Sequence, residues 1–242
     1  MGKSTLSALV IRWLKERGVN SILAVDADAN VNLNDLLGVK VENSLGEIRE
    51  EMKESIDNLP GGMTKQQFME YKIHQCLTEN EGFDLITMGR PEGPGCYCYS
   101  NNLLRDILKQ LSDNYDYVVI DNEAGMEHLS RRTVQNIDYL LIISDPSVRG
   151  VQSAGRISRL LKELDTRIGR KNLIVNRVNN SLSVEIKKQI EIEHLELLAA
   201  INTSDEIGEF DAAGVPVYKI SADSSIYAEV DRFMSELLPN LK

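Results

Sequence analysis

Short apolar runs alternate with amphipathic helical stretches along the whole chain, and this alternation limits the fold more than any other feature of the sequence. It is typical of βα units built around a mostly parallel sheet. Buried parallel strands are read as short, continuous apolar runs. We expect strands at 22–26, 83–89, 117–121, 139–145, 173–177 and 197–202. The sequence therefore predicts an α/β fold with a doubly wound, mostly parallel sheet.

Amphipathic stretches between these runs predict the helices. Two of them begin with capping-box spacing, Ser44 followed by Glu47 and Thr64 followed by Gln67. We expect helices at 3–17, 45–59, 65–77, 102–111, 150–164, 184–194 and 224–238. No repeat, low-complexity tract or linker divides the chain, and 242 residues suffice for one large core. Residues 1–242 are predicted to form a single domain.

Composition and charge exclude several classes of protein. The chain is 42% hydrophobic and 26% charged, as in ordinary globular proteins, and no apolar run approaches the roughly 20 residues of a membrane helix. Its start does not resemble a secretory signal, so we expect a soluble, cytoplasmic protein. A net charge of −10 argues against nucleic acid or an anionic membrane as the main partner.

The chain opens on Gly2-Lys3-Ser4-Thr5, which is the second half of a phosphate-binding loop. A helix beginning here points backbone N–H groups and the positive end of its dipole at phosphate. Lys3 would reach the β and γ oxygens of a nucleotide, and the Ser4 hydroxyl would bind magnesium. The alternative is an ordinary helix start with a serine or threonine cap.

A strand ordinarily precedes such a loop, and none does here. We expect that roughly a dozen residues, one strand and half a loop by typical element lengths, come before Met1 in the intact protein. In this interpretation the first strand of the fold is missing from the sequence. The alternative is a degenerate member that binds nucleotide poorly.

Carboxylates follow two of the apolar strands. The run from Ile22 leads into Asp26 and Asp28, and the run from Tyr117 ends in Asp121. Ligands of open α/β sheets lie at the carboxyl ends of the strands, where carboxylates can hold hydrated magnesium or orient an attacking water. We predict that Asp26 and Asp28 hold magnesium or orient the attacking water, and that Asp121 is a magnesium ligand. An Asx-rich turn leading into the next helix is the alternative for Asp26 and Asp28.

Two cysteines, Cys96 and Cys98, lie in a turn-rich loop after the 83–89 strand. Two thiolates leave a tetrahedral site half complete, and a two-fold axis through the loop would supply the other two. Such a four-sulfur site suits nickel or zinc, with a cluster as the second choice. The alternative is a pair of buried small hydrophobic residues. Cys76 is predicted to belong to the core.

The histidines have no ligand-like spacing. His74 and His194 are not assigned a role, whereas His128 lies after Asp121 in a segment that contains Gly125 and could respond to the γ-phosphate. For His128 itself we expect a structural role, and sensing of nucleotide or metal is the alternative.

Together these residues resemble the deviant Walker A ATPases, the group that holds the MinD septum-placing proteins, the ParA partition ATPases and the nitrogenase iron protein. Members carry Gly-Lys-Gly-Gly-Val-Gly-Lys-Ser/Thr, and only the final Gly2-Lys3-Ser4-Thr5 is present here. The signature lysine of the group therefore cannot be assigned. The resemblance implies ATP hydrolysis by a homodimer, with Asp121 as the Walker B residue. It also implies that Asp26 and Asp28 belong to switch I, Asp26 as a magnesium ligand and Asp28 as a catalytic residue.

The pair Asn176-Arg177 resembles the adenine-side Asn-Arg of the group, in which the amide reads the base. The alternative for Asn176 is a turn residue at the end of a strand. Within the group, the segments 26–33, 88–102, 121–131 and 174–178 resemble the CooC-type accessory ATPases of CO dehydrogenase. The resemblance implies an ATP-dependent metallochaperone that delivers nickel to CO dehydrogenase or to another nickel enzyme such as acetyl-CoA synthase.

Three other functions stay open. An iron-sulfur, electron-donating ATPase similar to the nitrogenase iron protein predicts a brown protein. A MinD- or ParA-like regulator would be expected to have a basic amphipathic C-terminal helix, and the helix predicted at 224–238 is acidic. A metal-binding dimer without ATP turnover is the fourth. We therefore expect ATP or ADP, Mg²⁺ and interface Ni²⁺ or Zn²⁺ as cofactors, and no stable membrane association.

Overall fold

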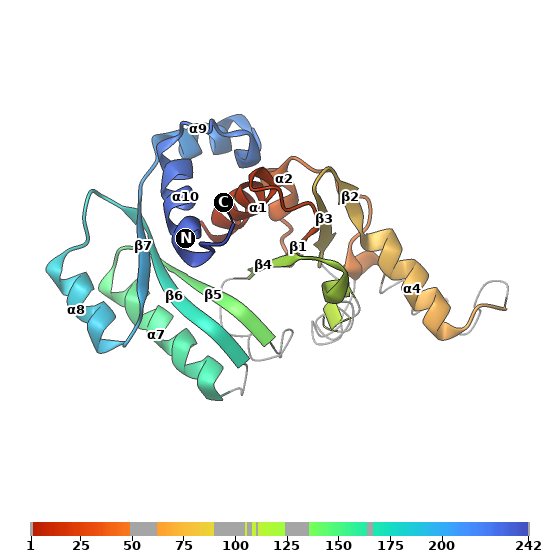
Figure 1. Ribbon diagram of the computed structural model, residues 1–242, viewed down its shortest axis with the longest axis horizontal. Helices are drawn as coiled ribbons and strands as arrows, with labels where there is room; N and C mark the ends of the chain where they lie inside the picture. Colours follow the sequence, from red (N-terminus) through yellow and green to blue (C-terminus); the bar gives the residue numbers. More distant parts are fainter. Residues whose placement is uncertain are drawn as a thin grey trace. The chain divides into compact units, whose positions relative to one another are not determined.

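The computed structural model describes residues 2–48, 62–89, 105, 108–109, 111–123, 136–163 and 167–241 (Figure 1). The chain divides into two compact units. Unit 1 comprises Met1–Trp13 and Gly125–Lys242, and unit 2 comprises Leu14–Ala124. Helix α1 (Lys3–Glu16) contributes residues to both.

Unit 2 contains a four-stranded sheet in the order β2-β3-β1-β4. The central strand β1 (Ile22–Ala27) runs parallel to β3 (Phe83–Thr87) and to β4 (Tyr117–Asn122), and β2 (Thr78–Asn80) pairs with β3 antiparallel. Every residue of β1 is buried, whereas β4, the outermost described strand on its side, is mostly half-buried. The apolar run from Ile22 thus forms the centre of the sheet, as a parallel strand covered on both faces should.

The helices of unit 2 begin where the capping signals predict. Thr64 and Gln67 form a complete capping box at the start of α4 (Lys65–Cys76). Ser44 and Glu47 form the same arrangement, with the Ser44 N–H donating to a Glu47 carboxylate oxygen at 2.7 Å and the Glu47 N–H donating to Ser44 Oγ at 3.4 Å. The described part of the unit also contains two short elements, α2 (Leu33–Leu37) and the 3-10 helix η2 (Ser112–Asn114).

Unit 1 contains an all-parallel sheet in the order β5-β6-β7. Its strands are β5 (Asn136–Ser144), β6 (Arg167–Val178) and β7 (Leu197–Asn202). Helices α7 (Val148–Glu163) and α8 (Val184–Ile192) lie side by side along this sheet (Figure 1). The core between them is made of aliphatic side chains, among them Ile142, Val151, Leu173, Val175, Ile186 and Ile190.

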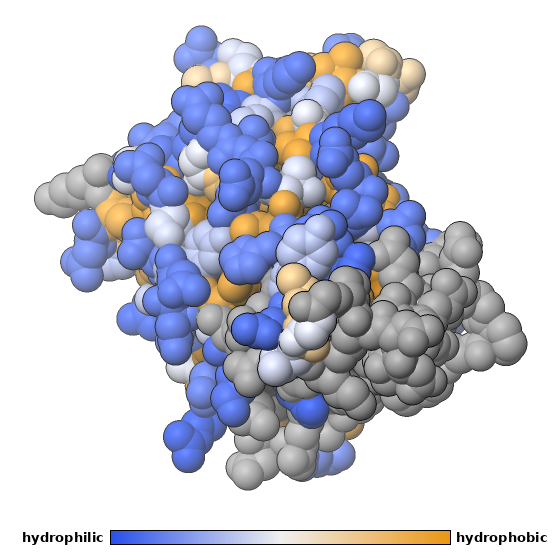
Figure 2. Space-filling view, turned by 90° about the vertical axis from the view of Figure 1, so that its right-hand side faces the viewer, coloured by the Kyte–Doolittle hydropathy of each residue, from blue (hydrophilic) through white to orange (hydrophobic). Residues whose placement is uncertain are grey.

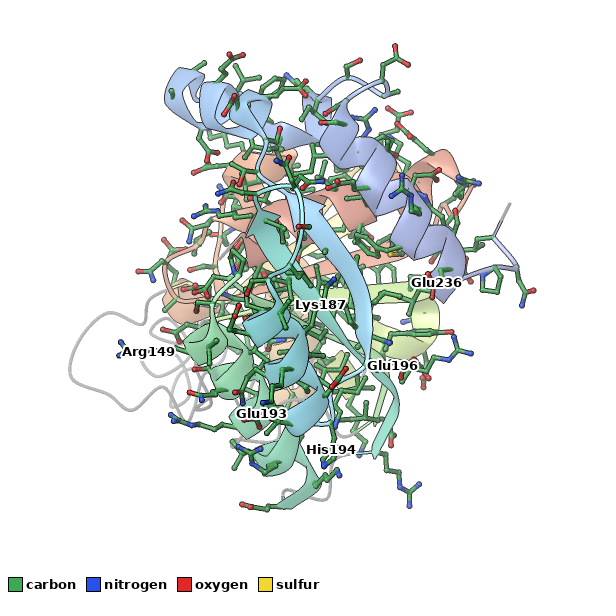
Figure 3. The ribbon with its side chains drawn as sticks, turned by 90° about the vertical axis from the view of Figure 1, so that its left-hand side faces the viewer. Arg149, Lys187, Glu193, His194, Glu196 and Glu236 are labelled. Atoms are coloured by element: carbon green, nitrogen blue, oxygen red, sulfur yellow. The ribbon has the colours of Figure 1, made fainter. Side chains whose placement is uncertain are left out.

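Glu193, just past the C-terminal end of α8, joins the two helices (Figure 3). Its carboxylate accepts a hydrogen bond from the Arg159 guanidinium of α7 and one from the Gln189 amide at 3.0 Å. A Cβ on Gly155 would lie only 2.0 Å from the Glu193 carboxylate. Glycine at this position of α7 therefore leaves the room that the Glu193 side chain occupies.

The rest of unit 1 fixes the first part of α1. The Arg12 guanidinium donates to the carbonyl oxygen of Ile220 and stacks over the ring of Tyr227, 4.3 Å from its centroid. The Trp13 indole donates to an Asp231 carboxylate oxygen at 2.7 Å. These partners lie in and before α10 (Ser225–Leu237), which follows α9 (Asp205–Ala213) and the 3-10 helix η3 (Val217–Lys219).

The structure confirms the α/β fold class and all six predicted strands. The described strands form two sheets, where the sequence predicted one. Strand β6 begins at Arg167, whereas the prediction began at 173, because its first half is polar and pairs only with β5. Strand β2 and helices α2 and α9 were not predicted; the first two are too short to show a periodic pattern. The predicted helices at 45–59 and 102–111 lie mostly outside the described residues.

Candidate functional site

Three buried polar side chains line the carboxyl end of the sheet in unit 2. Asp26 on β1 is paired in register with Asp121 on β4 and with Thr87 on β3. Paired residues of neighbouring parallel strands point to the same face of the sheet. Asp26 is 0% exposed, Asp121 2% and Thr87 1%. Two carboxylates therefore lie on adjacent strands, away from bulk water, with a hydroxyl on the far side of Asp26.

Asp26 closes the loop that follows β1. One carboxylate oxygen accepts the backbone N–H of Asp28 at 3.0 Å, and the other accepts those of Asn32 and Leu33, both at 2.9 Å. Burial raises the pKa of Asp26, and so does the neighbouring Asp28 carboxylate, whereas the three N–H groups lower it. The Asx-rich turn that the sequence left as an alternative is thus formed.

A carboxylate offers about four lone-pair positions, and three of those on Asp26 are used by backbone N–H groups. One position remains for a further hydrogen-bond donor, such as a magnesium-bound water. The predicted magnesium role of Asp26 and Asp121 therefore fits the loop geometry and stays a prediction.

Asp28 begins the loop itself. It is half-buried, and one of its carboxylate oxygens accepts the backbone N–H of Asn30 at 2.8 Å and the Asn30 side-chain amide at 3.1 Å. Val31, in the middle of the loop, has a positive φ of 49°. The side-chain carboxylate of Asp28 thus shapes the turn, and its predicted catalytic role is untested.

The N-terminus of α1 lies against Asn176 in unit 1. Gly2 has a φ of +81°, and its carbonyl accepts the Leu6 N–H at 3.1 Å, the first hydrogen bond of the helix. A Cβ on Gly2 would lie 2.5 Å from the Asn176 side-chain nitrogen. Glycine is therefore required here for both its backbone and its size. Lys3, Ser4 and Thr5 follow in the first turn of α1 and are half-buried, and this turn carries no acidic side chain.

Asn176, near the end of β6, is 7% exposed, and its side-chain oxygen accepts the backbone N–H of Arg177 at 2.9 Å. Arg177 is exposed and has a φ of +60°, a conformation that is uncommon for residues other than glycine. Unit 1 thus brings together two of the predicted nucleotide contacts, the helix start at Gly2 and the amide of Asn176.

The predicted site residues are divided between the two units. Lys3, Ser4, Asn176 and Arg177 belong to unit 1, and the three predicted carboxylates belong to unit 2. Cys96 and Cys98, as well as His128, lie outside the described residues. In the described part of the chain, no group of three or more His, Cys, Asp or Glu side chains is arranged to hold a metal ion. Cys76 is buried, as predicted, at 1% exposure.

Thr87 is the site residue that sequence reasoning missed. It ends an apolar run, Phe83-Asp-Leu-Ile-Thr87, just as Asp26 and Asp121 come at the ends of theirs. A polar residue at the end of a buried parallel strand was therefore the available signal.

The surface of the described residues bears on membrane association. None of their helices has the length and apolar character needed to cross a bilayer. On the face in Figure 2, hydrophobic residues appear in separate patches between hydrophilic ones. The large hydrophobic residues that are exposed include Met63, Tyr71, Tyr139, Val184 and Ile192.

A parallel sheet with buried carboxylates at its carboxyl end, and Gly-Lys-Ser-Thr at a helix start, define the class as a P-loop nucleotide-binding α/β protein. The family model described as "AAA domain" matches residues 1–175. The chain belongs to this family.

Comparison with known proteins agrees with this class. The chain is 40% identical over 240 residues to an uncharacterized ATP-binding protein of Methanocaldococcus jannaschii, covering 98% of this chain and 94% of that protein. It is 27% identical over 234 residues to the carbon monoxide dehydrogenase accessory protein CooC of Rhodospirillum rubrum, covering 91% and 87%. The fold is similar to that of the septum site-determining protein MinD of Pyrococcus horikoshii, solved with Mg-ADP, with a TM-score of 0.66, 21% identity and coverage of 100% and 93%.

Proposed function

We propose that this protein is an ATP-dependent metallochaperone, which binds nickel through Cys96 and Cys98 at a homodimer interface and assists its insertion into CO dehydrogenase. The likeness to the R. rubrum accessory protein over 91% of the chain carries this proposal. The Cys-x-Cys loop supports it, because paired thiolates from two subunits complete a tetrahedral site.

The nucleotide part of the proposal rests on residues of both units. In unit 1, the N–H groups at the start of α1 and the Lys3 ammonium bind the phosphates, and Asn176 with Arg177 contacts the base. In unit 2, Asp28 orients the attacking water.

Mg²⁺ fits the residues of unit 2 because the two buried carboxylates Asp26 and Asp121 are adjacent in register and would repel each other without a cation. When bound, the ion neutralises charge on the phosphates. Asp26 and Asp121 would hold its water shell, and Ser4 would supply a hydroxyl.

Nickel binding is tested by titration of the wild type and of the Cys96→Ala/Cys98→Ala double variant. We expect the wild-type dimer to bind nickel at one site made of the Cys96 and Cys98 thiolates of both subunits, and the double variant to lose this binding. Cys76→Ala is the matched control, since Cys76 is buried in α4 and should leave nickel affinity unchanged. Unchanged nickel affinity in the double variant contradicts the metallochaperone proposal.

ATP hydrolysis is tested separately, by phosphate release from the wild type, Lys3→Ala and Asp28→Asn. We expect turnover by the wild type and its loss in both variants, with ADP binding retained in Asp28→Asn. Nickel binding without any turnover by the wild type would instead support the metal-binding dimer that lacks ATPase activity.

A MinD- or ParA-like regulatory ATPase is the second candidate, and the fold likeness favours it. Against a membrane-bound regulator, α10 uses its apolar face within unit 1, where Tyr227, Val230 and Phe233 are buried. Co-sedimentation with anionic phospholipid vesicles tests this: stable binding in ATP favours the regulator. A brown protein with visible absorption as purified favours the iron-sulfur electron donor.

A further inference from the structure

We propose that Thr87 is a positioning residue of the magnesium site, and that its hydroxyl holds a water in the hydration shell of the ion beside Asp26. The proposal rests on the proposed function, because it assigns a role at the same site. It adds a third strand, β3, to the two that carry the carboxylates.

The first observation is the burial of an unpartnered polar atom. Thr87 is 1% exposed, and among the described residues its Oγ1 has no hydrogen-bond partner. A buried hydroxyl without a partner loses its hydrogen bonds to water and gains none in return, which destabilises the folded state. Such a group in a parallel sheet needs a reason, since valine has nearly the same shape and a higher tendency to form strands.

The second observation is the position of this atom. Thr87 is the registered neighbour of Asp26, which in turn neighbours Asp121, so the three side chains form one row across β3, β1 and β4. The hydroxyl makes no direct hydrogen bond to the Asp26 carboxylate. A bridging water can connect two polar groups that do not bond each other directly.

The third observation is the lone-pair count on Asp26. Backbone N–H groups of Asp28, Asn32 and Leu33 take three of about four positions, so this carboxylate can hold only one further hydrogen-bond donor. Magnesium keeps several of its waters and therefore needs acceptors for their hydrogens beyond its direct ligands. The Thr87 hydroxyl supplies such an acceptor where Asp26 is nearly saturated.

A purely structural role for Thr87 makes a different prediction. If the hydroxyl served packing alone, Thr87→Val would remove an unsatisfied polar atom, keep the shape and leave magnesium binding unchanged. Thr87→Ser, by contrast, keeps the hydroxyl and removes a methyl group. The two variants thus separate the polar function of Thr87 from its volume.

The experiment measures thermal unfolding of the full chain with ADP at a fixed concentration while Mg²⁺ is titrated. We expect Thr87→Val without Mg²⁺ to melt at or above the wild-type temperature, because the unpartnered hydroxyl is gone. We expect its half-saturating Mg²⁺ concentration to rise about tenfold, the equivalent of one lost hydrogen bond. For Thr87→Ser, the half-saturating Mg²⁺ concentration should stay within about twofold of the wild-type value. The affinity for metal-free ADP should be the same in the wild type and in both variants.

Two results overturn the proposal in distinguishable ways. A wild type that shows Mg²⁺-dependent ADP stabilisation, together with a Thr87→Val variant of the same Mg²⁺ dependence, contradicts the role of Thr87 alone. A wild type without Mg²⁺-dependent stabilisation contradicts the proposed nucleotide function, and the role of Thr87 with it.

Discussion

The buried polar residues at the carboxyl ends of the two sheets differ in charge. In unit 2 the last buried polar residues are Asp26, Asp121 and Thr87, two of which are acids. In unit 1 they are Ser144 on β5 and Asn176 on β6, both neutral. The carboxylate that follows β5, Asp145, accepts a hydrogen bond from Ser147 at the start of α7.

This difference leads us to expect different contributions from the two units. Buried acids side by side favour a cation, whereas a buried amide next to a helix N-terminus suits a neutral base and an anionic phosphate. Each variant below changes one residue at the carboxyl end of one sheet or at the helix start beside it. The Asp26 variants test what the buried acid contributes to stability, and Gly2→Ala and Asn176→Ala test nucleotide binding.

The largest effect is expected from Asp26→Ala. The substitution leaves the N–H groups of Asp28, Asn32 and Leu33 without their acceptor, at about 1–3 kcal/mol each where they stay buried. We expect the free energy of unfolding to fall by about 3 kcal/mol or more in urea denaturation. Asp84→Ala is the control, because Asp84 accepts one side-chain hydrogen bond, from Tyr115 at 2.6 Å, and should cost about 1 kcal/mol. Equal losses in the two variants would contradict this account.

Gly2→Ala should act on nucleotide binding in unit 1. The added Cβ lies 2.5 Å from the Asn176 side-chain nitrogen, and alanine at a φ of +81° costs about 1–2 kcal/mol. We expect ADP affinity, measured by calorimetry, to fall by about tenfold or more. Gly18→Ala provides the comparison, since Gly18 has a φ of +80° but nothing within 4 Å of the added atom. An equal loss of affinity in both would point to backbone strain rather than to Asn176.

Asn176→Ala should have a smaller and more selective effect. Loss of one amide contact to the base lowers ADP affinity by about tenfold or less. The half-saturating Mg²⁺ concentration should not change, because Asn176 is not among the residues predicted to hold magnesium. A higher half-saturating Mg²⁺ concentration in Asn176→Ala than in the wild type would contradict this expectation.

The smallest effect is the pH dependence that Asp26 contributes. Burial raises its pKa in the folded state, so the folded protein takes up this proton before the unfolded chain does as the pH falls. The resulting stability is fully present below the unfolded pKa of about 3.9 and is lost as the pH rises through the folded pKa. Relative to Asp26→Asn, the wild type should therefore gain stability from pH 7 toward about pH 4, by at most about 1.4 kcal/mol per pH unit. Urea denaturation at several pH values measures this, and a gain in the opposite direction contradicts the raised pKa.

The sequence predicted the elements well where a local pattern specifies them. The apolar run at Ile22 and the capping box at Thr64 are local, and both are found in the structure. The start of β6 was missed because the polar residues from Arg167 to Asn172 are held in the strand by pairing with β5, a long-range cause.

Site residues followed the same rule. The acids at the ends of two strands were recognised. Thr87 was overlooked because its strand was predicted to run on to residue 89, which put its hydroxyl inside the run, whereas the strand ends at Thr87. The saturation of Asp26 by backbone N–H groups depends on the path of the loop through Asn32 and Leu33, which residue types alone do not specify.

The position of β4 affects how the protein behaves in solution. It is the outer strand of its sheet among the described residues, and its first four residues, Tyr117-Val-Val-Ile120, carry no charge. An outer strand of this composition offers backbone donors and acceptors to any further strand. Concentrated samples should therefore self-associate through this edge, and Val118→Lys should raise the concentration at which light scattering first increases.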